Sequence, residues 1–256
     1  MSITKDKKLK NLLEQWPPGL VATSPWLKEM SISGQLAQRY LKSGWIESLG
    51  RAAYKRTNDE INWYGGLASL QQQLSLDIHL GGPTALSIKG SSHYARFGKE
   101  RIFLFSALNQ KLPKWFLDYD WGNPIEHIKT SVLPSDLAIK EYKFNGMGIK
   151  ISAPERAILE CLYLSPKNFD LLECYQIMEG LTTLRPKVLQ ELLEMCGSIR
   201  VKRLFLYMAD KARLPVLEHL DLNNIDLGKG DRSIVKDGAY NAQYRISLPK
   251  ELVDYV

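Results

Sequence analysis

Polar side chains with the chemistry to recognise bases recur at intervals of three and four residues within the segment 33–43. A helix would place them on one face: Gln35, Gln38, Arg39 and Lys42. Glutamine can form two hydrogen bonds with adenine, and arginine can do the same with guanine. The face carries no acid, which suits approach to a polyanion. A solvated helix face is the alternative interpretation of the same pattern.

Two short helices joined by a tight turn would position this face. Ser24 followed by Pro25 predicts the start of the first helix, because serine accepts a free N–H and proline needs no partner there. Ser33 can cap the second helix and is itself a candidate DNA contact. Gly44 is suited to end that helix. Apolar residues form its opposite face: Leu36, Ala37, Tyr40 and Leu41. The pattern predicts a helix-turn-helix.

A hairpin should follow the second helix, with strands near 45–48 and 52–56. A basic hairpin in this place is typical of a wing. Three of its cations would meet phosphates or the minor groove: Arg51, Lys55 and Arg56. Residues 1–60 hold ten Lys/Arg against six Asp/Glu, a large part of the net charge of +6 on the whole chain. This excess indicates a nucleic-acid partner.

The length of 256 residues allows two ordinary domains. A polar break at 58–60 predicts a winged helix-turn-helix DNA-binding domain at 1–58 and a C-terminal domain at 61–256. A hydrophobic content of 45% is typical of a folded soluble protein. Neither a membrane-spanning run of about 18–20 apolar residues nor an apolar signal-peptide core is evident. The three cysteines are far apart and contain no C-x-x-C, so we expect a cytoplasmic protein.

The second domain should combine a small sheet with a helical bundle, which makes the fold class α+β. Strand patterns predict a mostly antiparallel sheet from segments 101–106, 126–133, 137–144 and 148–152. From Ser152 onward the periodicity becomes helical, and apolar stripes predict helices near 154–162, 171–181, 186–196 and 199–210. The prediction is a winged helix followed by a larger mixed α/β domain.

Catalytic patterns are incomplete. Gly98-Lys99 resembles part of a phosphate-binding loop, but Glu100 stands where Ser or Thr must hold magnesium. Gly90-Ser91-Ser92 resembles the start of a nucleotidyltransferase site, which requires paired carboxylates for two metal ions. Asp118 and Asp120 are a close pair but lack the expected partner motif. The four histidines, His93 among them, are scattered, with no close Cys/His set. We expect no enzyme activity, no cofactor and no metal.

Two further groups of charged residues stand out. The first is the pair Glu155–Arg156, expected to match a helix dipole and to form a surface ion pair worth under about 1 kcal/mol. A separate candidate, His79, is expected to be structural rather than catalytic. The second is the segment 195–245, with nine Lys/Arg against six Asp/Glu. It is either a solvated helix surface or a second polyanion surface formed by Arg200, Lys202, Arg203, Lys229 and Arg232.

Four segments, taken in order, resemble the AbiEi antitoxins across nearly the whole chain. They are Ser43-Gly44-Trp45-Ile46-Glu47 through Tyr54-Lys55-Arg56, His79-Leu80-Gly81-Gly82-Pro83-Thr84-Ala85-Leu86, Ser152-Ala153-Pro154-Glu155-Arg156-Ala157-Ile158-Leu159-Glu160, and Leu227-Gly228-Lys229-Gly230 before Tyr244. The chain departs from the family at Ala52-Ala53, where the family usually carries a glycine before the wing tyrosine.

The resemblance implies a winged helix-turn-helix that represses its own operon and a C-terminal domain that confers antitoxicity. The implied partners are operator DNA, expected to be an inverted repeat, and a nucleotidyltransferase-like toxin that the antitoxin need not contact. Such type IV pairs act in abortive phage infection. The alternatives are a winged-helix regulator whose C-terminal domain senses a ligand and, from another class, a metal-dependent nucleotidyltransferase.

Overall fold

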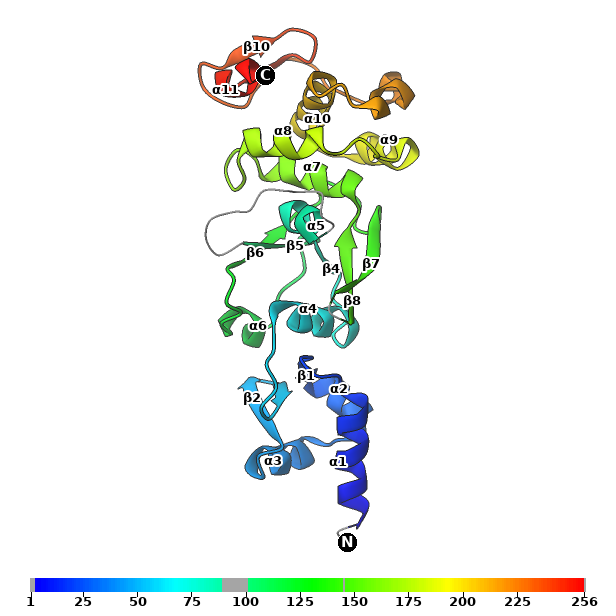
Figure 1. Ribbon diagram of the computed structural model, residues 1–256, viewed down its shortest axis with the longest axis vertical. Helices are drawn as coiled ribbons and strands as arrows, with labels where there is room; N and C mark the ends of the chain where they lie inside the picture. Colours follow the sequence, from blue (N-terminus) through cyan, green and yellow to red (C-terminus); the bar gives the residue numbers. More distant parts are fainter. Residues whose placement is uncertain (1–2, 89–100, 145, 256) are drawn as a thin grey trace.

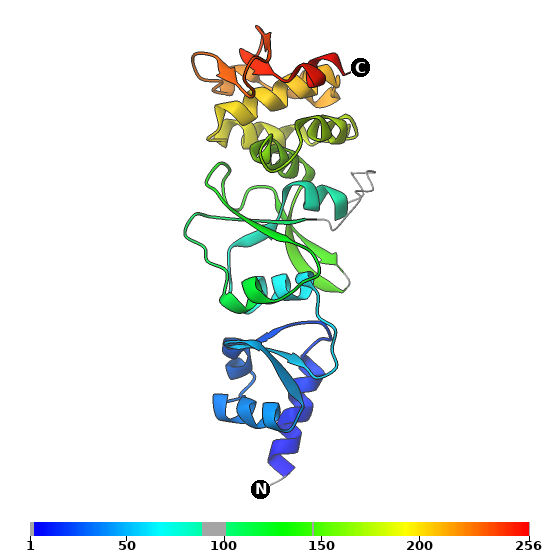
Figure 2. The same ribbon diagram turned by 90° about the vertical axis from the view of Figure 1, so that its left-hand side faces the viewer.

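Three parts of the chain follow one another along the long axis of the molecule (Figures 1 and 2). A computed structural model describes residues 3–88, 101–144 and 146–255. The winged helix with the N-terminus lies at one end, a unit built on a five-stranded sheet lies in the middle, and a helical unit with the C-terminus lies at the other end.

The first part is a winged helix, as predicted. Its elements are α1 (Ile3–Gln15), β1 (Ala22–Thr23), α2 (Ser24–Glu29), α3 (Gly34–Lys42), β2 (Ile46–Gly50) and β3 (Ala53–Arg56). The strands form an antiparallel sheet in the order β1-β3-β2. Leu12 and Trp16, at the end of α1, are buried against this sheet and the two shorter helices, so α1 closes the small core.

The middle part contains a mixed sheet in the order β6-β5-β4-β8-β7. Its elements are α4 (Trp63–Gln72), β4 (Ile78–Leu80), α5 (Gly82–Ile88), β5 (Ile102–Ser106), α6 (Lys114–Asp118), β6 (Ile125–Lys129), β7 (Ile139–Phe144) and β8 (Met147–Ser152). The pairs β4–β5 and β7–β8 are antiparallel, whereas β4–β8 and β5–β6 are parallel. The expectation of a mostly antiparallel sheet was therefore wrong for half of its pairings, and β6 ends before the predicted residue 133.

Strand β5 separates two hydrophobic clusters. Because successive side chains of a strand point to opposite faces, Phe103 and Phe105 belong to the cluster shared with the helical part. Ile102 and Leu104 belong to the cluster shared with α4, α6 and the winged helix. All five residues of β5 are buried, which explains its continuous apolar sequence.

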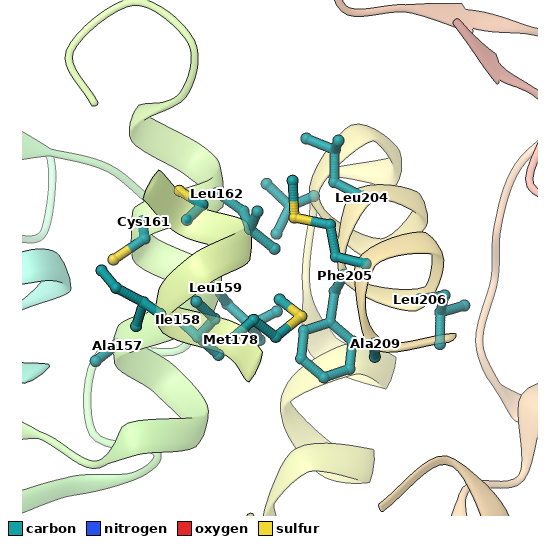
Figure 3. Packing of buried hydrophobic residues seen from close by; sticks show 14 of the residues in the cluster. Ala157, Ile158, Leu159, Cys161, Leu162, Met178, Leu204, Phe205, Leu206 and Ala209 are labelled. Atoms are coloured by element: carbon teal, nitrogen blue, oxygen red, sulfur yellow. The ribbon is translucent and has the colours of Figure 1, made fainter. Parts of the chain in front are cut away.

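The third part is helical, with a small sheet in the order β10-β11-β9 at its far end (Figure 1). Its elements are α7 (Pro154–Leu164), α8 (Leu171–Glu179), α9 (Pro186–Met195), α10 (Ile199–Lys211), η1 (Pro215–His219), η2 (Leu222–Asn224), β9 (Arg232–Ser233), β10 (Ala239–Asn241), β11 (Ile246–Leu248) and α11 (Lys250–Asp254). Helix α7 lies between the sheet and the other helices, and its Ile158 and Leu162 pack in one cluster with Phe205 of α10 (Figure 3). Within the described ranges, the structure contains no helix with the length and apolar character needed to span a membrane.

Side chains of α4 and its C-terminal cap form hydrogen bonds with the backbone of the winged helix. The Ser69 hydroxyl donates to the carbonyl of Val21 at 2.6 Å. At the end of α4, the Gln73 amide donates to the same carbonyl at 2.8 Å and accepts from the N–H of Thr23 at 2.8 Å. These bonds hold strand β1 in a fixed position on the middle part.

Close backbone contact adds to this joint. A Cβ placed on Gly65 of α4 would lie 2.0 Å from the carbonyl oxygen of Gly19. Buried residues of the winged helix, such as Val21, also belong to the same hydrophobic cluster as Leu67 and Leu70 of α4. The polar residues 58–60 thus connect two parts that pack against each other.

Candidate functional site

The helix-turn-helix begins one residue earlier than the sequence predicted. The Thr23 hydroxyl, and not that of Ser24, accepts from the N–H of Trp26 and caps α2. Ser33 caps α3 as expected, since its hydroxyl accepts from the N–H of Leu36 at 3.3 Å. Beyond α3, Gly44 has a φ of +72°, a left-handed conformation that glycine adopts without strain.

Helix α3 separates its polar and apolar residues as predicted. Ala37 and Tyr40 are buried, and Leu36 and Leu41 pack against the same cluster. The polar face is exposed throughout: Gln35, Gln38, Arg39 and Lys42, with Ser33 exposed at the cap. A surface helix with two glutamines, an arginine and a lysine is available to bond with base edges and phosphates.

The wing is a hairpin of β2 and β3 with an irregular register between Ser48 and Gly50. Arg51 is exposed in its turn. The next residue, Ala52, has a φ of +65°, the left-handed region in which a Cβ is strained. The absent family glycine therefore falls at a turn where glycine would be the less strained residue.

The other two predicted wing cations have partners within the chain. Lys55 Nζ lies 3.1 Å from a Glu47 carboxylate oxygen and donates to the carbonyl of Asp59. Arg56 donates to the carbonyl of Trp16 at 3.0 Å and lies 3.8 Å from the Asp59 carboxylate. Their first role is to connect the wing with α1 and the following segment, which leaves Arg51 as the exposed cation of the hairpin.

The expected second polyanion surface loses two of its five members, Lys202 and Arg203, to burial. Arg203 is 1% exposed and donates to four backbone carbonyls, those of Leu227, Gly228, Gly230 and Arg245. Burial lowers the pKa of its guanidinium. The arginine thus organises the Leu227–Gly230 segment and cannot face a polyanion.

The neighbours of Arg203 on α10 also donate to backbone carbonyls. Lys202 is 3% exposed and donates to the carbonyl of Asp226 at 3.0 Å. Arg200 donates to the carbonyls of Tyr163 and Ser165, where α7 ends. Lys229 is exposed, and Arg200 and Arg232 are half-buried, so these three remain near the surface.

Glu155 and Arg156 do not form the expected surface pair. Both side chains are buried, at 2% and 4% exposed. Glu155 accepts two hydrogen bonds from the guanidinium of Arg185, both at 2.9 Å. Arg156 instead donates from Nε to Glu160 at 2.7 Å. The earlier estimate for a solvated pair does not apply to these contacts.

Glu160 is the centre of a buried polar network. Its Oε1 accepts from Arg156 and from His79 Nε2 at 2.9 Å, and its Oε2 accepts from the N–H of Gly82 and the hydroxyl of Ser152, each at 2.8 Å. Burial raises its pKa, but the charge interactions with His79 and Arg156 and the donated hydrogen bonds outweigh burial and lower the pKa to about 2. An ionised carboxylate only accepts, so His79 must carry its proton on Nε2.

This network brings together two of the segments that carried the family resemblance. His79 and Gly82 belong to one of them, and Ser152, Arg156 and Glu160 to the other. They lie where β4, α5, β8 and α7 meet. His79 is structural, as expected, but its partner Glu160 could not be predicted, since 81 residues separate them.

A pocket of about 400 Å³ opens beside this network. It is lined by the end of β5, the segment that follows β6, the start of α7 and the end of α9. The lining residues are Asp77, His79, Phe105, Ser106, Ala107, Thr130, Ser131, Leu133, Pro134, Ser135, Arg156 and Met195. Its volume lies in the range of pockets that bind small molecules.

The remaining chemical candidates that the structure describes form no assembled site. Gly90-Ser91-Ser92, His93 and Gly98-Lys99 with Glu100 lie outside the described residues. Asp118 pairs with Lys114 at 3.9 Å, and Asp120 accepts from the N–H of Gly122 in a local turn. In the three described stretches, no group of three or more His, Cys, Asp or Glu residues is placed to hold a metal ion.

Comparisons with known proteins place this geometry in a family. No curated protein matched the chain. Among solved structures, the crystal structure of the RV2827C protein from Mycobacterium tuberculosis has a similar fold, with a TM-score of 0.64 at 14% identity over 95% of this chain and 90% of that one. Residues 5–97 match a family described as the N-terminal domain of the AbiEi antitoxin transcriptional regulator. Residues 99–249 match a family described as a transcriptional regulator, the AbiEi antitoxin of a type IV toxin–antitoxin system. The chain belongs to the AbiEi family of antitoxin transcriptional regulators.

Proposed function

We propose that this chain is the antitoxin of a type IV pair, that it represses its own operon by binding operator DNA, and that it neutralises a nucleotidyltransferase-like toxin in abortive phage infection. In this proposal the protein acts in the cytoplasm without catalysis or a cofactor. The winged helix binds the operator, and the rest of the chain provides antitoxicity.

The observation that carries the DNA-binding proposal is the exposed polar face of α3. Gln35 and Arg39 are one helical turn apart and both are exposed, so both can reach bases in one major groove. Arg51 lies on the adjacent wing, where it can bind phosphate. If two copies bind, the operator should be an inverted repeat with half-sites about 10 bp apart or a multiple of that.

The two arginines should affect binding differently. Arg39→Ala should cost about 1–3 kcal/mol on the DNA upstream of the operon and much less on random DNA, because a base contact carries sequence information. Arg51→Ala should weaken both by similar factors and reduce the salt dependence by about one ion. Gel shifts over a salt series measure both effects, with Lys187→Ala, an exposed site on α9, as the control.

Two outcomes would contradict this assignment. Equal losses for Arg39→Ala on both DNAs would remove α3 from base recognition. Failure of the unaltered protein to prefer its upstream DNA would reject operator binding as a whole.

Antitoxicity is tested separately by co-expression with the neighbouring toxin gene under independent promoters. Growth should be restored by the unaltered chain and equally by Arg39→Ala, since that residue lies on the winged helix at the end remote from the helical part. Loss of growth rescue in Arg39→Ala, with normal protein levels, would contradict the proposed division of roles.

A further inference from the structure

The pocket beside Glu160 is lined by a guanidinium group whose hydrogen-bond donors are not all used within the protein. Arg156 lines the pocket and is 4% exposed. Its Nε donates to Glu160, and its Nη1 donates to the carbonyls of Pro134 and Leu137. Its Nη2 has no hydrogen-bond partner among residues 3–88, 101–144 and 146–255. This nitrogen is not among the fully buried atoms that lack a partner, so it is open to water or to a ligand in the pocket.

Glu160 cannot supply the missing acceptor. Each of its two oxygens already accepts two hydrogen bonds, from Arg156 and His79 on one side and from Gly82 and Ser152 on the other. A carboxylate offers about four acceptor positions, so this one is saturated. Nη2 therefore remains available to an acceptor inside the pocket.

The pocket lining suits a small anionic group. Hydroxyl side chains from the segment after β6, Thr130, Ser131 and Ser135, stand in the same lining as the guanidinium. Phe105, Leu133 and Met195 provide apolar surface for the rest of a ligand. Guanidinium N–H groups match the oxygens of carboxylates and phosphates in geometry and charge. Asp77 is the opposing feature, an exposed carboxylate that also lines the pocket.

We propose that this pocket binds a small molecule through one carboxylate or phosphate group, with Arg156 Nη2 as the principal donor and the neighbouring hydroxyls as further donors. This site lies away from the DNA-reading face of α3 and does not depend on operator binding. Because the Asp77 carboxylate repels an anion, removal of its charge should strengthen binding. An increase in affinity on this change is specific to an anionic ligand.

The test uses the full chain with sodium phosphate or sodium acetate as the probe, each against sodium chloride at equal ionic strength. Calorimetric titration should show saturable binding of at least one probe, and the arm that binds identifies the preferred anion. Asp77→Asn should raise the affinity a few-fold. Ser131→Trp, an enlargement of an exposed lining residue, should lower the affinity at least ten-fold.

Thr182→Trp provides the matched control, since it places the same side chain at an exposed position outside the pocket and should leave binding unchanged. Phosphate bound by the basic winged helix would be insensitive to both Ser131→Trp and Asp77→Asn. Absence of saturable binding of either probe, equal behaviour of the two tryptophan variants, or weaker binding in Asp77→Asn would overturn the proposal.

Discussion

The joint between the winged helix and the middle part can be tested with one methyl group. Gly65 lies within α4, where alanine would ordinarily stabilise a helix by up to about 1 kcal/mol. Its Cβ, however, would lie 2.0 Å from the Gly19 carbonyl oxygen and 3.1 Å from the Gly19 carbonyl carbon. A contact of 2.0 Å essentially never occurs, so the winged helix must move by about 1 Å or more from α4.

The cost follows from what that movement breaks. Three hydrogen bonds cross the joint, from Ser69 to Val21 and between Gln73 and both Val21 and Thr23. At about 1 kcal/mol each they contribute roughly 3 kcal/mol, and repacking of the shared apolar cluster adds about 1–3 kcal/mol. Part of this loss is relieved by bending, so we expect Gly65→Ala to lower the free energy of unfolding by about 2–4 kcal/mol.

Urea unfolding followed by tryptophan fluorescence measures this loss. The matched control is Gly34→Ala at the start of α3, where no atom lies within 4 Å of the added Cβ and stability should be equal or slightly higher. If Gly65→Ala were as stable as Gly34→Ala, the close contact between α4 and Gly19 would not exist in solution, and the winged helix would not be fixed to the rest of the chain.

Two further predictions concern Glu160 and the wing. Because the folded-state pKa of Glu160 is lowered from 4.5 to about 2, its ionised form contributes stability above pH 4.5 that is lost as the pH falls toward 2, roughly 3 kcal/mol in all. In urea unfolding at several pH values, Glu160→Gln should therefore be much less stable than the unaltered chain at pH 7, with a gap that narrows below pH 4.5; a gap independent of pH would refute the assignment. Ala52→Gly should raise the unfolding free energy by about 0.5–1 kcal/mol, because it removes the Cβ from a residue with a φ of +65°. A loss of stability in thermal unfolding would show that the turn has another conformation.

Local patterns allowed the winged helix to be predicted. The cap at Ser33, the glycine at 44 and the alternation of polar and apolar residues on α3 all act within a few residues, so their consequences are visible in the sequence. The predicted cap of α2 was wrong by one residue. Thr23 and Ser24 can both cap a helix, and the pairing of strand β1 determines which of them does.

Long-range contacts were not predictable in this way. Nine bases in the segment 195–245 indicated a charged surface, but α10 is covered on most sides, and Arg203 binds carbonyls 24 to 42 residues away. Charge counts carry no information about burial, and an arginine can satisfy several backbone carbonyls as readily as a phosphate. The parallel pairing of β4 with β8 was also not predictable, because its partners, Leu80 and Ile151, are far apart in the sequence.

The Glu160 network joins two of the four segments that carry the family resemblance. Its four donors come from β4, α5, β8 and α7, so one carboxylate fixes the middle sheet to the helical part. Removal of any one donor would leave a buried charge less compensated, and breaking such a pair costs several kcal/mol. The residue types at these positions are therefore restricted by the fold itself. The exposed residues of α3 carry no such restriction, because each can change without disturbing the core.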